Sequence, residues 1–193
     1  MKLFKLVRCL ILLSLMTQLF ACAAVVVGGA AATGTAVVDR RTTGTLVEDQ
    51  TIEIKAGQTI RTDVELNEQA HMNITSYNSV VLITGETPTD AMRQRAMQLV
   101  KATEKVTHVY NELTIAAPSS LMSRSSDSYI TAKVKTQMFA NNEISGVFFK
   151  VVTEKGVVYL MGIVSHAEAE KATEIARQTG GVQKVVKLFQ YTD

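Results

Sequence analysis

The chain has 193 residues, and its 20 Lys and Arg against 18 Asp and Glu give a formal net charge of +2. Three of the cations, Lys2, Lys5 and Arg8, stand in the first eight residues, and without them the count is 17 against 18, a net charge of −1. A chain with this balance has no general attraction for a phosphate backbone, so we exclude nucleic acid as a partner.

Residues 1–21 have the parts of a secretory signal peptide. The three cations begin the segment, an apolar run from Cys9 to Met16 follows, and the small residue Ala21 precedes Cys22. Exported proteins begin in this way. A membrane-spanning helix would need about 20 consecutive apolar residues, and polar residues interrupt this run. The sequence therefore predicts cleavage before Cys22.

The tetrapeptide Leu19-Phe20-Ala21-Cys22 resembles the lipobox of bacterial lipoproteins. The resemblance implies that Cys22 carries a diacylglycerol on its sulfur and an acyl chain on its amine. No aspartate follows the cysteine, which by the same resemblance implies an anchor in the outer membrane, with the protein on the periplasmic face. Cys22 would also be the single cysteine of the mature chain, which fits lipidation better than a disulfide. A chance cysteine after an ordinary signal is the alternative.

Residues 22–44 are predicted to form the lipidated N-terminus and a tether. They are rich in Ala, Val, Gly and Thr, and their only charges are Asp39, Arg40 and Arg41. Such a segment is too short to span a bilayer and too rich in glycine to pack a core. A tether that stays close to the membrane, with the two arginines near lipid headgroups, and a merely flexible linker are both compatible with it.

The rest of the chain contains an internal repeat. Residues 80–85 (VVLITG) match residues 157–162 (VVYLMG) at an offset of 77. Upstream, three apolar residues match at an offset of 78: Ile52, Ala56 and Ile60 with Ile130, Val134 and Met138. Offsets that differ by one residue are typical of two copies of one fold with small loop insertions. We predict one domain over 45–116, a linker over 117–123 and a second domain over 124–193.

The second copy shows the order of elements most clearly. Asp127 is predicted to cap a helix, which is followed by strands over 147–153 and 157–162. Ser165, with Glu168 three residues on, is predicted to form the capping box of a second helix, and a strand over 182–191 follows. The first copy repeats this order. Its hairpin turn is expected at Asn78-Ser79, its second helix near 89–103 and its last strand over 109–115. The order αββαβ predicts an α+β fold in which a three-stranded mixed sheet packs on two helices.

This pattern resembles the BON domain. The residues that carry the resemblance are 158–162 (VYLMG) with 181–185 (GVQKV), and 80–85 with 106–109 (VTHV), where the first copy lacks the glycine before its valine. Two such domains behind a lipobox resemble the dual-BON lipoproteins of the outer membrane. The resemblance implies a non-enzymatic protein that binds anionic phospholipid, helps maintain outer-membrane integrity and is connected with division sites and outer-membrane protein assembly.

Catalysis is not expected from the sequence. The histidines, His71, His108 and His166, fall in different elements, and no spacing typical of metal ligands, of a phosphate loop or of a nucleophile with its base is present. We therefore predict no catalytic, cofactor-binding or metal-binding residues.

Charge differs between the copies and indicates which of them meets a membrane. Residues 45–116 hold six Lys and Arg against ten Asp and Glu, whereas residues 124–193 hold nine against seven. The copy with net charge +2 is the better candidate for contact with anionic lipid, and the acidic copy, at −4, is the better candidate for docking a protein. The second hypothesis for function is accordingly a periplasmic adaptor for outer-membrane assembly or envelope-remodelling machinery.

The first helix of the second copy is predicted to have two apolar faces. One face carries the core residues, and the other is predicted to bind lipid through four residues: Tyr129, Lys133, Lys135 and Phe139. Aromatic rings suit the lipid interface and lysines suit phosphate groups. The alternative is that Tyr129 and Phe139 pack against the first domain or against residues 147–149.

Overall fold

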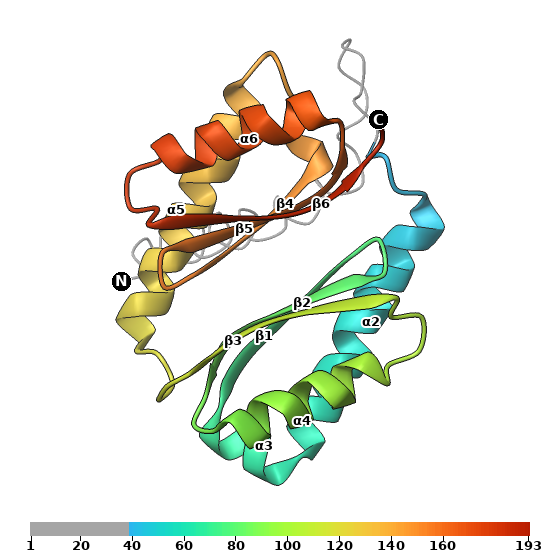
Figure 1. Cartoon of the computed structure of the whole chain (residues 1–193), viewed down its shortest axis with the longest axis vertical. Helices are drawn as coiled ribbons and strands as arrows, with labels where there is room; N and C mark the ends of the chain where they lie inside the picture. Colours follow the sequence, from blue (N-terminus) through green and yellow to red (C-terminus); the bar gives the residue numbers. More distant parts are fainter. Residues whose placement is uncertain (1–38) are drawn as a thin grey trace, which may run out of the picture. The chain divides into compact units, whose positions relative to one another are not determined.

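The computed structural model of the chain describes residues 39–193 (Figure 1). The predicted signal peptide, Cys22 and the tether up to residue 38 lie outside the described residues. From residue 39 onward, no helix is both long enough and apolar enough to cross a membrane.

The first repeat is a three-stranded mixed sheet with its helices on one face (Figure 1). Strand β2 lies in the centre, antiparallel to β1 and parallel to β3. In chain order the elements are α2 (Thr43–Thr62), α3 (Val64–Gln69), β1 (His71–Tyr77), β2 (Val80–Thr87), α4 (Asp90–Lys101) and β3 (His108–Ile115).

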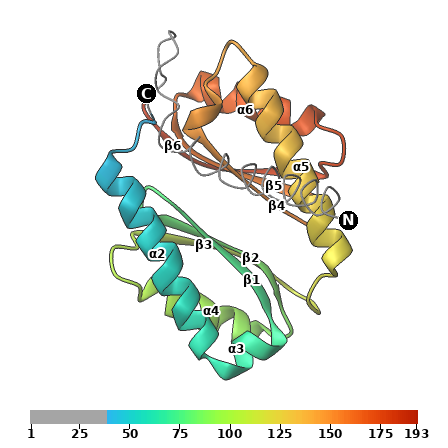
Figure 2. The ribbon, with the colours of Figure 1, turned by 180° about the vertical axis from the view of Figure 1, so that it is seen from behind.

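The second repeat has the same topology, with β5 in the centre, antiparallel to β4 and parallel to β6. Figure 2 shows α5 and α6 on one face of this sheet. Its elements are α5 (Leu121–Ala140), the 3₁₀ turn η1 (Gly146–Phe148), β4 (Phe149–Glu154), β5 (Val157–Val164), α6 (His166–Gln178) and β6 (Lys184–Tyr191). The predicted α+β fold of two αββαβ units with mixed sheets is confirmed.

Each repeat has its own hydrophobic core between sheet and helices. Alternate residues of the central strand, Val81 and Ile83 in β2, point to the helices, because successive side chains of a strand face opposite sides. The matched apolar triplets at i, i+4 and i+8 supply the helix side of each core: Ile52, Ala56 and Ile60 in α2, and Ile130, Val134 and Met138 in α5.

A third apolar cluster joins the other faces of the two sheets. Tyr77 and Leu82 from the first repeat contact Tyr159, Met161 and Leu188 from the second, and all five are buried. The Tyr77 hydroxyl also donates a hydrogen bond to the Phe148 carbonyl oxygen at 3.0 Å. The sheet faces that carry no helix are therefore not free surfaces.

The predicted cap of the first helix in the second repeat is wrong. Helix α5 begins at Leu121, inside the segment predicted as a linker, because the Ser120 side chain accepts a hydrogen bond from the Ser123 amide. Asp127 is buried within the helix and accepts hydrogen bonds at 2.8 Å from the Lys155 and Gly156 amides in the β4–β5 turn.

Two smaller differences have local causes. Helix α3 was not predicted, and the Asp63 side chain caps it by accepting a hydrogen bond from the Leu66 amide. The strand predicted from residue 147 begins at Phe149, because residues 146–148 form the 3₁₀ turn. The predicted capping box of α6, between Ser165 and Glu168, is present.

Candidate functional site

Helix α5 has one buried and one exposed face, as the sequence pattern predicts. Ile130, Val134 and Met138 are at most 6% exposed, whereas Tyr129 is 66% exposed and Phe139 is 61% exposed. The first repeat does not cover Tyr129. Phe139 lies next to Gly146, close enough that an added β-carbon there would come within 2.8 Å of its ring, but most of the ring stays accessible.

The two predicted lysines lie on α5 with these aromatic residues. The Lys133 ammonium stands 5.5 Å from the centre of the Tyr129 ring and donates a hydrogen bond to the Gly180 carbonyl oxygen at 3.1 Å. Lys135 is exposed two positions further along the helix. Within residues 39–193, neither lysine forms a salt bridge with an acidic side chain.

The exposed face of α5 extends further than the sequence analysis indicated. Leu121 and Met122, in the first turn, are each 80% exposed. Met122 is seven positions from Tyr129, and Leu121 is 18 positions from Phe139, so each pair falls on one side of a helix with about 3.6 residues per turn. We call the four apolar residues Leu121, Met122, Tyr129 and Phe139, with Lys133 and Lys135, the α5 face. The first two were missed because the helix was expected to begin at Asp127.

The equivalent helix of the first repeat offers a different surface. At an offset of 78, Thr51 of α2 corresponds to Tyr129 and Arg61 to Phe139. Helix α2 does expose Val47 and Ile54, at 62% and 51%. However, it carries three acidic and two basic residues, a net charge of −1, whereas α5 carries one acidic and three basic residues, a net charge of +2. The combination of exposed aromatic rings and positive charge is therefore specific to α5.

Arg40, which was considered for lipid headgroup contact, is bound to the second repeat instead. Its guanidinium forms two hydrogen bonds of 2.8 Å with the Glu168 carboxylate and one of 2.9 Å with the Ile163 carbonyl oxygen. It also lies over the Phe148 ring, 4.1 Å from the ring centre. Burial alone would raise the pKa of Glu168, but the hydrogen bonds from Arg40 and Ser165 outweigh it and lower the pKa.

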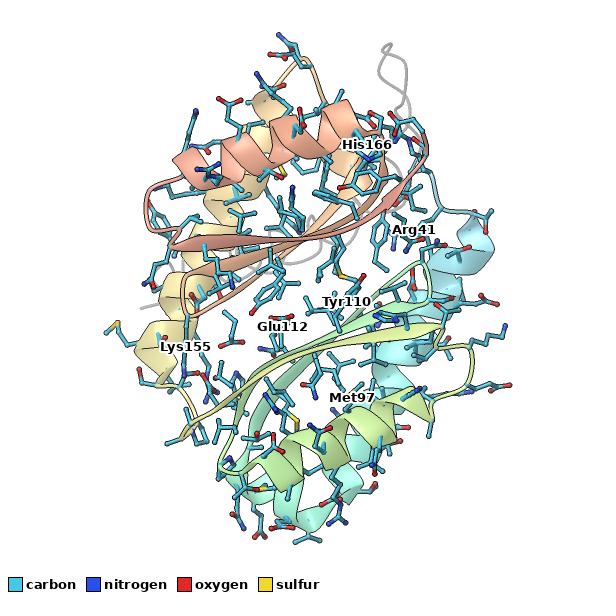
Figure 3. The ribbon with its side chains drawn as sticks, viewed as in Figure 1. Arg41, Met97, Tyr110, Glu112, Lys155 and His166 are labelled. Atoms are coloured by element: carbon cyan, nitrogen blue, oxygen red, sulfur yellow. The ribbon has the colours of Figure 1, made fainter. Side chains whose placement is uncertain are left out.

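Arg41 is bound to the first repeat. Its guanidinium pairs with Asp39 at 2.8 Å and with Asp49 at 3.0 Å, and it lies 3.9 Å from the centre of the Tyr77 ring (Figure 3). The two consecutive arginines before α2 therefore contact different repeats: Arg40 contacts the second repeat and Arg41 the first. Both charges are satisfied within the protein, which leaves the α5 face as the better candidate for contact with lipid.

The three histidines have separate surroundings. His166 stacks on Tyr191, with ring centres 3.9 Å apart, and pairs with Asp193 at 2.9 Å (Figure 3). His108 contacts the Tyr110 ring edge-on. His71 lies near two buried glutamates, a grouping that the linear sequence did not indicate.

Comparison with known proteins agrees with this architecture. The BON domain family matches residues 48–117 and 126–193, and the chain belongs to this family. The chain is 38% identical to the outer membrane lipoprotein DolP of Haemophilus influenzae over 183 aligned residues. The aligned region covers 95% of this chain and 95% of DolP. The predicted class, a dual BON-domain lipoprotein of the outer membrane, is thereby confirmed.

Two further relatives are similar over most of their length. The chain is 38% identical to a 21 kDa hemolysin of Actinobacillus pleuropneumoniae over 154 residues. These residues make up 80% of this chain and 79% of the hemolysin. The chain is 27% identical over 145 residues to the osmotically-inducible protein Y of Escherichia coli, with 74% and 72% covered.

Proposed function

We propose that this outer-membrane lipoprotein binds anionic phospholipid through the α5 face and thereby helps maintain the integrity of the outer membrane, including at division sites. The single observation that carries the proposal is the coincidence, on one helix, of two aromatic rings more than 60% exposed and two lysines that form no salt bridge within residues 39–193. The acyl chains on Cys22 form the permanent anchor in this proposal.

The apolar part of the α5 face supplies the membrane affinity. Partial burial of four large side chains in the headgroup region contributes about 1 kcal/mol or more for each residue. The two lysines add roughly 1 kcal/mol each next to an anionic surface, and salt weakens this part. The anchor keeps the domain at the membrane, so even a millimolar intrinsic affinity gives a substantial bound fraction.

A double substitution on the α5 face tests the proposal. Tyr129→Glu with Phe139→Glu places two carboxylates where the rings would enter the lipid, and we expect sedimentation with phosphatidylglycerol-containing vesicles to be lost. The matched control is Thr51→Glu with Gln58→Glu, which adds the same charge at exposed positions on α2. We expect the control to retain binding.

The alternative function, a periplasmic adaptor for outer-membrane assembly machinery, is supported by the charge of −4 over residues 45–116. The same pair of variants separates the two functions. If the folded α5 double variant still binds vesicles as well as the wild type does, lipid binding by this face is refuted. The adaptor would then be the function that the charge of the first repeat favours.

A further inference from the structure

A cluster of histidine and glutamate side chains lies where the two repeats meet. In the β1–β2 ladder His71 is paired with Glu86, so both side chains point to the sheet face that carries no helix. Glu154 reaches the same place from the end of β4 in the second repeat. One ligand atom from each of these three residues lies within 4.8 Å of the other two.

The two carboxylates are buried, and each accepts one hydrogen bond within the described residues. Glu86 is 0% exposed and Glu154 is 7% exposed. One oxygen of Glu86 accepts a hydrogen bond from the Ser119 amide at 3.0 Å, and one oxygen of Glu154 accepts a hydrogen bond from the Asn73 amide group at 3.1 Å. The second Glu86 oxygen is buried without a well-aligned hydrogen bond in the described part of the chain, although the Lys155 ammonium lies 2.8 Å from it.

Charged side chains of both signs surround the cluster. Glu86, Glu154 and the nearby Asp127 contribute three carboxylates. The Lys155 ammonium pairs with Glu86, and Arg124 and Lys150 line the cavity beside His71 and Glu154. Burial raises the pKa of Glu154, and the carboxylates of Glu86 and Asp127 raise it further against the opposing Asn73 hydrogen bond. A buried carboxylate is costly unless a positive charge or hydrogen-bond donors satisfy it.

The histidine can supply a nitrogen ligand. His71 is half-buried at the start of β1, and its Nε2 lies 3.5 Å from the Asn73 amide nitrogen. Imidazole nitrogens are common ligands of transition-metal ions. A cavity of about 520 Å³ is lined by His71, Asn73 and Glu154 among others, which gives a small ion a route to the cluster.

We propose that His71, Glu86 and Glu154 bind one divalent transition-metal cation, with Zn²⁺ the first candidate. One imidazole nitrogen and two carboxylate oxygens form a three-ligand set that leaves a fourth position for water. Bonds of about 2.0–2.2 Å would bring the ligand atoms to roughly 3.4 Å from one another, a movement that side-chain rotations can supply. Two carboxylates also balance the charge of the ion.

The ion would replace the Lys155 ammonium as the partner of Glu86. The Lys155 side chain is 39% exposed and stands at the β4–β5 turn, from which it can turn to solvent (Figure 3). Because His71 and Glu86 belong to the first repeat and Glu154 to the second, the bound metal would connect the two repeats. We therefore expect metal to stabilise the pair of domains together.

Titration calorimetry with ZnCl₂ at neutral pH tests the site, on untagged protein of residues 39–193, which lie within one compact unit. We expect one Zn²⁺ per chain and a higher unfolding temperature with Zn²⁺ than with a chelator. His71→Ala and Glu154→Gln should each weaken binding by about tenfold or more. The control His108→Ala, at an exposed histidine on β3, should leave binding unchanged.

Substitution of Lys155 gives a test in the opposite direction. Lys155→Asn removes the competing cation at a residue with a φ of +49°, a conformation that asparagine tolerates. We expect Zn²⁺ to bind about tenfold more tightly to this variant, because a positive charge a few ångströms from the ion is removed. Absence of binding to the wild type, binding that persists in His71→Ala, or weaker binding in Lys155→Asn would each overturn the proposal.

Discussion

The buried carboxylate of Asp127 is expected to stabilise the second repeat by holding the β4–β5 turn. Its two oxygens accept hydrogen bonds of 2.8 Å from the Lys155 and Gly156 amides. Hydrogen bonds to a charged group contribute about 1.5–3 kcal/mol each. Asp127→Ser, whose shorter side chain cannot reach the turn, should therefore lower the free energy of unfolding by about 3 kcal/mol. For a chain of this length the unfolding temperature should fall by roughly 6–12 °C.

Serine is chosen because it distinguishes the two roles that Asp127 can have. Serine and aspartate are about equally good helix caps, so the substitution would be nearly neutral if Asp127 began the helix. Urea denaturation gives the change in unfolding free energy, and amide exchange at Gly156 reports on the turn. Ser120→Ala, at the cap that the structure shows, should cost about 1 kcal/mol without faster exchange at Gly156. A change below about 0.5 kcal/mol for Asp127→Ser would refute the assignment.

Three further substitutions have expected outcomes. Arg40→Gln should lower the unfolding free energy in urea by about 1–2 kcal/mol at neutral pH. The pKa of Glu168 is lower in the folded state than its ordinary value of 4.5, so this stabilisation is fully present above pH 4.5. It is lost as the pH falls through the folded-state pKa, and the unfolding free energies of wild type and variant should therefore become equal in acid. Gly85→Ala should cost about 3 kcal/mol or more by the same denaturation, since a β-carbon there would lie 2.0 Å from the His71 carbonyl oxygen at a φ of +119°. Leu160→Ala, at a fully buried position of β5, should lower the free energy of unfolding by about 2–5 kcal/mol, which calorimetry would detect as a lower unfolding temperature.

Much of each repeat could be predicted from local patterns. The i, i+4, i+8 spacing of Ile130, Val134 and Met138 identified the buried face of α5, and the same spacing in α2 revealed the repeat. The capping box of Ser165 and Glu168 marked the start of α6, because it depends only on residues three positions apart. Local signals of this kind do not need knowledge of the tertiary fold.

Contacts between the repeats could not be predicted in this way. Arg40 pairs with Glu168, which lies 128 positions further along the chain, and no local pattern indicates that pairing. The neighbours of His71 depend on the β1–β2 register and on the approach of the second repeat. Asp127 shows how a local pattern can mislead, since an acidic residue before an apolar helix is typical of a helix cap. In the structure Asp127 lies within α5, is buried, and its carboxylate binds the β4–β5 turn instead.

Sedimentation of residues 39–193, without acyl chains, with lipid vesicles tests the central claim most directly. Neutral vesicles and phosphatidylglycerol-containing vesicles are compared at low and at high salt. The proposed role of the α5 face predicts stronger binding to the anionic vesicles than to the neutral ones. Salt should weaken this binding without abolishing it, since the apolar residues contribute independently of charge. Equal binding to neutral vesicles, or no binding to either, would contradict it.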